Sequence, residues 1–103
     1  MSDGAVVTDH PESSRYELHV GGRRAGVATY ARHGNRVEVL HTEVDPEFRG
    51  RGLADQLARG VLDDLARRGL SVTPTCPFLA GYLRRHPADL ALVDEAHRGA
   101  FTA

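Results

Sequence analysis

Three segments in the first half of the chain alternate apolar and polar side chains, which is the period of half-buried β-strands. They cover residues 15–20, 25–32 and 36–44. The pair Gly21-Gly22 between the first two segments is typical of a two-residue hairpin turn. A His-Gly-Asn turn at residues 33–35 precedes the third. The pattern therefore predicts an antiparallel meander of three strands.

A helical period begins at Leu53 and continues to Arg68. Apolar side chains recur there every three to four residues and form one stripe, made of Leu53, Leu57, Val61 and Leu65 with Ala54, Ala58, Leu62 and Ala66 beside them. Gly69 is the type of residue that ends such a helix. A short strand at 70–75 follows. Strand, helix and strand of these lengths predict a right-handed crossover between parallel strands.

A second helix is expected from Cys76-Pro77, because proline favours the first helical position. Pro87 ends it. The whole pattern predicts an α/β fold in which the antiparallel meander is followed by a β-α-β unit and a second helix.

Residues 15–88 hold all of these elements and are expected to form one domain. The polar segment 1–14 is expected to be a flexible arm, with a short strand-like segment at Ala5–Thr8. Residues 89–103 contain one apolar patch and then become polar, so they are expected to form a loosely packed tail.

The turn between the third strand and the first helix has the chemistry of a phosphate cradle. Gly50 and Gly52 have no Cβ, so a ligand can approach the backbone closely. The first N–H groups of the helix are unpaired and the helix dipole is positive there. Arg49 and Arg51 add charge and forked donors suited to phosphate. The turn is therefore a candidate site for a pyrophosphate.

Two common nucleotide motifs do not fit this turn. A P-loop needs Lys followed by Ser or Thr, but Leu53-Ala54 stand there. The dinucleotide motif needs a third glycine where the chain has Asp55. The remaining pattern, R-x-x-G-x-A at residues 49–54, resembles the acetyl-CoA pyrophosphate loop of GNAT-type N-acetyltransferases. That resemblance implies that backbone N–H groups of Arg49 to Ala54 hold the pyrophosphate.

A second motif makes the resemblance more specific. Residues 76–87, CPFLAGYLRRHP, resemble the signature of the short single-domain GNAT-like acetyltransferases. Residues 15–18 and 41–44 also fit that group, and the resemblance extends over about residues 15–88. It implies a fold that binds acetyl-CoA as cosubstrate and transfers acetyl to a primary amine of a protein or small molecule. Larger GNAT enzymes have additional helices and strands, so the acceptor site here is expected to be open or completed by a partner.

The resemblance also implies roles for single residues. Val44 corresponds to the backbone contact with the pantetheine arm. Cys76, at the start of a helix, is a candidate nucleophile, because that position favours the thiolate; a small buried core residue is the other interpretation. His41 is a candidate general base, with Glu43 on the same strand as the alternative.

Charge and composition limit the kinds of partner and cofactor that are expected. The chain has 13 basic and 14 acidic side chains, so neither nucleic acid nor an anionic membrane is expected as the main partner. One cysteine permits no internal disulfide, which suits the cytoplasm. None of the six histidines has zinc-ligand spacing to that cysteine, so no metal is expected. The rival function is a non-catalytic acyl-CoA-binding or sensing module; the acceptor amine and the oligomeric state stay open.

Overall fold

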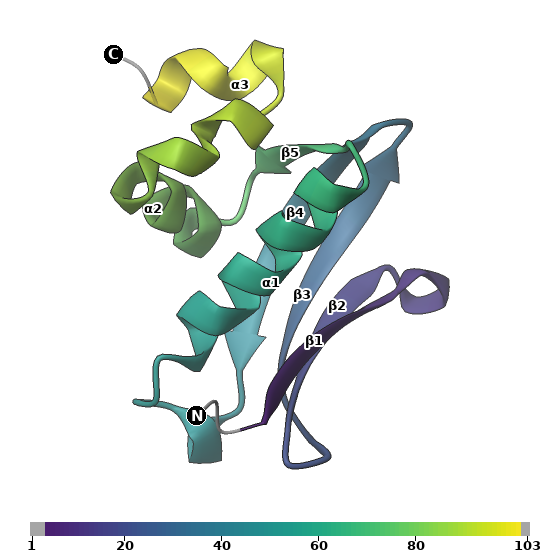
Figure 1. Cartoon of the computed structure of the whole chain (residues 1–103), viewed down its shortest axis with the longest axis vertical. Helices are drawn as coiled ribbons and strands as arrows, with labels where there is room; N and C mark the ends of the chain where they lie inside the picture. Colours follow the sequence, from purple (N-terminus) through teal and green to yellow (C-terminus); the bar gives the residue numbers. More distant parts are fainter. Residues whose placement is uncertain (1–3, 102–103) are drawn as a thin grey trace.

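The computed structural model describes residues 4–101, which build one five-stranded sheet with a long helix on one face (Figure 1). The strands are β1 (Ala5–His10), β2 (Arg15–Val20), β3 (Arg23–His33), β4 (Arg36–Val44) and β5 (Ser71–Pro74). They lie side by side in sequence order. Strands β1 to β4 are antiparallel, and β5 is parallel to β4. The predicted α/β fold, with its meander and its parallel crossover, is confirmed.

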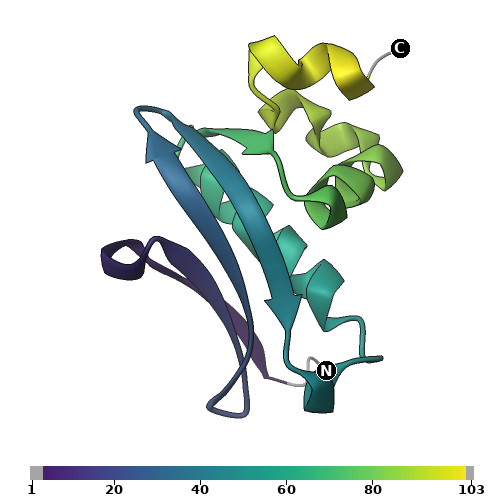
Figure 2. The same cartoon turned by 180° about the vertical axis from the view of Figure 1, so that it is seen from behind.

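The helices lie on one face and at one edge of this sheet. Helix α1 (Leu53–Arg67) crosses the face, whereas α2 (Pro77–Arg85) and α3 (Glu95–Arg98) gather beyond β5 (Figures 1 and 2). Four 3-10 segments complete the described chain: Pro11–Ser13, Pro46–Phe48, Pro87–Leu92 and Gly99–Phe101. No helix within residues 4–101 is both long and apolar enough to cross a membrane.

The apolar stripe of α1 forms the centre of the core. Leu57, Leu62 and Leu65 are completely buried against the sheet, where Leu18 and Val39 meet them. Full burial of one such side chain contributes about 1.5–3 kcal/mol. The stripe expected from the sequence is therefore the face that holds α1 on the sheet.

Strand β1 replaces part of the flexible arm that the sequence suggested, and it extends the strand-like segment expected at Ala5–Thr8 to His10. Residues 5–10 pair with β2 along their whole length, from Ala5 opposite Val20 to His10 opposite Arg15. Long-range contacts hold this strand: Asp9 accepts hydrogen bonds from the Tyr30 hydroxyl at 2.6 Å and from Arg68 at 3.0 Å. Tyr30 and Arg68 lie far from Asp9 in the sequence, so the local pattern indicated only part of this strand. The rest of the expected arm before residue 4 lies outside the described residues.

The carboxyl-terminal segment is also better packed than expected. Val93 is fully buried and forms a bridge with Val72 of β5. The N–H of Asp94 donates to the carbonyl of Val72 at 2.9 Å, and the Thr73 hydroxyl donates to the Asp94 carboxylate at 2.6 Å. Residues 93 and 94 therefore continue the sheet edge beyond β5, and the prediction of a loose tail was wrong for them.

Candidate functional site

The loop between β4 and α1 presents backbone N–H groups at a helix N-terminus. Gly50 and Gly52 have φ angles of +82° and +71°, which glycine adopts without strain. Gly52 is the N-cap of α1 and makes no side-chain capping bond. The first intrahelical hydrogen bond runs from the Gln56 N–H to the Gly52 carbonyl at 3.2 Å. The N–H groups of residues 53–55 precede that bond, so they are available to an anion.

Space and charge around this loop suit a phosphate ligand. A Cβ built at Gly50 or at Gly52 meets no atom within 4 Å, so the space above both residues is open. Arg49 and Arg51 are exposed on either side. The Arg51 guanidinium lies 5.4 Å from the centre of the Phe48 ring, which places its charge over the turn before the helix.

The end of β4 provides a second binding surface next to the loop. Strand β5 pairs with β4 only through Arg36–Val39, and the Cys76 N–H then bonds to the Val39 carbonyl at 2.9 Å. Beyond Val39, strand β4 and the segment that follows β5 separate. The Asp45 N–H bonds to β3, so the backbone groups of Val44, one residue earlier, face the other edge. There the Val44 carbonyl accepts a hydrogen bond from Arg49 Nε at 3.4 Å.

A hollow of about 420 Å³ lies along this open edge, lined by His41, Thr42, Glu43, Val44, Arg49, Ala54 and Phe78. It shares Val44, Arg49 and Ala54 with a smaller hollow of about 200 Å³ over the glycine loop. The structure thus brings together the expected pyrophosphate loop and the expected pantetheine contact in one groove. An extended ligand with an anionic end and an amide-bearing arm matches the donors and acceptors of this groove.

A β-bulge determines which way the candidate bases point. In the β3–β4 pairing, Tyr30 faces Val39 and Thr29 faces His41, so Leu40 is an extra residue. Tyr30 and Val39 are buried on the α1 side. The extra residue reverses the alternation, and His41 and Glu43 therefore lie on the opposite side of the strand. Both are exposed where they line the hollow.

Cys76 lies apart from these two residues. It is 3% exposed, and its Sγ donates to the Thr42 hydroxyl at 3.4 Å. Thr42 alternates with His41 and Glu43, so its side chain points to the other face of β4. The strand therefore separates the thiol from both candidate bases. The sequence analysis did not identify Thr42 as the partner of Cys76. Its position between His41 and Glu43 on an alternating strand could have indicated that its side chain points to the other face.

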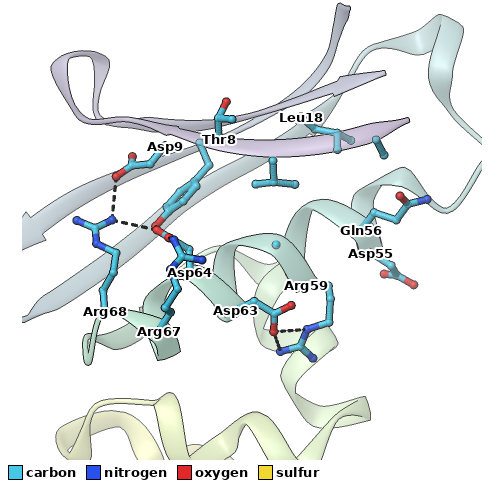
Figure 3. Close-up of a pocket in the computed structure, with 14 residues that line it drawn as sticks. Thr8, Asp9, Leu18, Asp55, Gln56, Arg59, Asp63, Asp64, Arg67 and Arg68 are labelled. Atoms are coloured by element: carbon cyan, nitrogen blue, oxygen red, sulfur yellow. Dashed lines mark hydrogen bonds and ion pairs between the residues drawn. The ribbon is translucent and has the colours of Figure 1, made fainter. Parts of the chain in front are cut away.

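A larger hollow of about 970 Å³ lies elsewhere, between α1 and the strands β1 and β2 (Figure 3). The charged groups at the β1 end of this hollow bond to one another. Arg68 donates to Asp9 and to Asp64, at 3.0 Å in each case, and the Tyr16 hydroxyl donates to Asp64 at 2.6 Å. Burial and the hydrogen bond to Asp64 raise the pKa of Tyr16 well above its usual value, so this phenol stays a neutral donor. We therefore locate the candidate site in the groove of β4 and the glycine loop.

An α/β sheet whose strand ends diverge beside a helix N-terminus is an arrangement typical of proteins that bind nucleotide-type ligands. Within that class, the chain belongs to the family of GCN5-related N-acetyltransferases, whose family model matches residues 15–99. Mouse Protein NATD1 is 31% identical over 87 residues, which are 82% of this chain and 79% of that protein. Human Protein NATD1 is 37% identical over 51 residues, which span half of this chain and 45% of the human protein.

Solved structures agree on the fold. A Staphylococcus aureus protein described as GCN5-like superimposes with a TM-score of 0.66 over 91% of both chains, at 18% identity. The ribosomal-protein-S18-alanine N-acetyltransferase from Escherichia coli superimposes with a TM-score of 0.52 at 19% identity. That match covers 70% of this chain and 42% of the enzyme. The sheet and helix arrangement is thus that of N-acetyltransferases.

Proposed function

We propose that this protein binds acetyl-CoA in the groove and transfers the acetyl group to a primary amine of a protein or small molecule. The observation that carries the proposal is the continuity of the groove: unpaired N–H groups at the start of α1 join an uncovered edge of β4. The pyrophosphate would lie on the N–H groups of residues 49–54. The pantetheine arm would pair with the backbone of Val44, chiefly by accepting from its N–H, since the Val44 carbonyl already accepts a hydrogen bond from Arg49.

The transfer itself follows from this placement. The amine nitrogen attacks the thioester carbonyl carbon, the C–S bond breaks, and CoA leaves as a thiolate. The proton lost by the amine passes to His41 or, as the alternative, to Glu43. Direct attack is favoured over an acetylated Cys76, because the thiol is enclosed and bonded to Thr42. Catalysis would come from positioning and from proton removal.

The binding step has a direct test in thermal unfolding. At acetyl-CoA concentrations 100 times the dissociation constant, linkage stabilises the fold by about 2.7 kcal/mol. For a domain of this length, that is a rise in melting temperature on the order of 10 °C. No rise at millimolar acetyl-CoA would contradict the proposal.

Two glycine variants locate the ligand. Gly52→Ala places a methyl group in the open space over the loop, and Gly34→Ala does the same in the hairpin turn, where φ is +63°. Both variants carry the same left-handed strain, about 1–2 kcal/mol. Only Gly52→Ala should lose the melting shift. Equal shifts in both variants would place the ligand outside the loop.

A second candidate function is a binding module without catalysis. The connection between β1 and β2 favours this function, because it is only a 3-10 turn at Pro11–Ser13 and does not enclose a binding site for the acceptor amine. Release of free CoA thiol in a panel of primary amines distinguishes the two. Thiol release above the uncatalysed rate supports transfer; acetyl-CoA binding with no release supports the module.

A further inference from the structure

The sheet face opposite α1 carries a cluster of His10, Glu17 and His19. Glu17 and His19 alternate with Leu18, whose side chain is fully buried in the core, so both point away from α1. His10 ends the neighbouring strand, where it lies opposite Arg15. The Glu17 residue is 7% exposed although it carries a carboxylate. The cluster is thus partly enclosed, and it joins β1 to β2.

The three side chains direct their ligand atoms at one point. Nε2 of His19 lies 2.9 Å, and Nε2 of His10 lies 3.5 Å, from the same oxygen, Oε1 of Glu17. One ligand atom from each of the three residues can be chosen so that all three lie within 4.8 Å of one another. Two ligands of a tetrahedral zinc ion, each at about 2.0–2.2 Å, are separated by about 3.3–3.6 Å. The 3.5 Å separation lies within that range. The 2.9 Å separation is a hydrogen bond that an ion would replace, so His19 and Glu17 would have to move apart by about half an ångström to bind it.

Two outer contacts of the cluster, one at His10 and one at Glu17, suit a metal site. Histidines that bind a metal usually offer their second ring nitrogen to a carboxylate. Nδ1 of His10 lies 3.4 Å from the Glu12 carboxylate. Arg15 donates from Nε to Oε2 of Glu17 at 2.7 Å, which leaves Oε1 directed at the two rings. The Thr8 hydroxyl, 3.1 Å from Nε2 of His10, can turn away because it is exposed.

We propose that His10, Glu17 and His19 bind one zinc-type divalent cation through Nε2, Oε1 and Nε2, with solvent in the fourth position. Two imidazoles and a carboxylate are a ligand set that zinc accepts. The ion would tie the edge strand β1 to β2. The sequence expectation of no metal was based on spacing to Cys76, whereas this set arises from strand pairing. His10 precedes the part of the chain that the family model matches, and the proposal does not depend on acetyl-CoA.

The test is a zinc titration of the full chain without an affinity tag, followed by equilibrium dialysis and by thermal unfolding. One zinc ion per chain should bind, and free zinc at 100 times the dissociation constant should raise the melting temperature by about 10 °C. His10→Ala and His19→Ala should each weaken binding at least about tenfold. The control is His33→Ala, which removes the histidine of another pair, 3.3 Å from Glu38. That variant should bind as the parent does.

Two outcomes would overturn the proposal: zinc binding below one ion per chain at saturating zinc, or equal affinity in His19→Ala and the parent. Circular dichroism without zinc shows whether each variant is folded. If a variant does not fold, the histidine ring NMR signals of the parent decide the question. Zinc should shift the ring signals of His10 and His19 and leave those of His33 in place; shifts at other histidines alone would refute the site.

Discussion

Gly60 offers a sharp test of the packing between α1 and the edge strand. It lies in the middle of α1, where alanine would be preferred by about 1 kcal/mol on helix propensity alone. A Cβ at this position would lie 2.6 Å from Cβ and from Cγ2 of Val7, and 3.0 Å from its Cγ1. Those distances are far shorter than any van der Waals contact between carbon atoms. The missing side chain therefore allows β1 to approach the helix.

The expected effect of Gly60→Ala is the difference between two opposing contributions. Overpacking of this kind costs about 1–3 kcal/mol, and the gain in helix propensity returns about 1 kcal/mol. The variant should thus lose up to about 2 kcal/mol of unfolding free energy. For a chain of this length, each kcal/mol lowers the melting temperature by about 4 °C or more.

Gly81→Ala is the matched control for this experiment. Gly81 lies inside α2, and a Cβ there meets no atom within 4 Å. The unfolding free energy of this control should rise by about 0.5–1 kcal/mol, because alanine has a higher helix propensity than glycine and no clash opposes it. Urea denaturation of the parent and both variants measures the contrast. A Gly60→Ala variant as stable as Gly81→Ala would refute the close approach of β1 to α1.

Three further predictions concern charge and chemistry. Hydrogen bonds from Arg59 lower the pKa of Asp89 in the folded protein. The ionised Asp89 carboxylate therefore stabilises the fold at pH values above its unfolded pKa, about 3.9, and this contribution is lost as the pH falls through the lower folded pKa. Asp89→Asn should be about 1 kcal/mol less stable than the parent at neutral pH and match it in strong acid, by urea denaturation; an equal gap at both would contradict this. His41→Ala should lower the acetyl-transfer rate about 10²-fold if His41 is the base, whereas a loss confined to Glu43→Ala assigns that role to Glu43. Cys76→Ala should keep the rise in melting temperature caused by acetyl-CoA, and its transfer rate should fall less than that of the variant lacking the general base. Intact-mass spectrometry provides the opposing outcome: a stoichiometric acetyl adduct on the parent that is absent from Cys76→Ala would make the thiol the nucleophile.

Local patterns were sufficient for much of the fold. The strands at 15–20 and 36–44 have the predicted bounds, and α1 ends one residue before its predicted end. These segments bury one regular face, so their period is strong and their partners follow from short connections. The glycine-rich loop was likewise evident from its chain position, since a strand before it and a helix after it determine where its N–H groups point.

Features that depend on distant partners could not be predicted in this way. Strand β1 was expected only as a strand-like segment at Ala5–Thr8, and it is held by Tyr30 and Arg68, which are remote along the chain. The position of Val93 against β5 is another such contact. The bulge at Leu40 is subtler. Unbroken alternation would place His41 on the face of Val39, and only the register with β3 shows the reversal.

The uncapped start of α1 has a consequence for the free protein. A Ser, Thr, Asp or Asn side chain at the N-cap accepts a hydrogen bond from the first turn of a helix, and glycine in its place costs only a few tenths of a kcal/mol. Gly52 provides no such acceptor. The N–H groups of residues 53–55 have no acceptor within the helix, so their amide hydrogens should exchange with solvent faster than those at Leu57 and beyond. An anion bound there would take the place of the absent cap, so slowed exchange at residues 53–55 would report occupancy even when no product is formed.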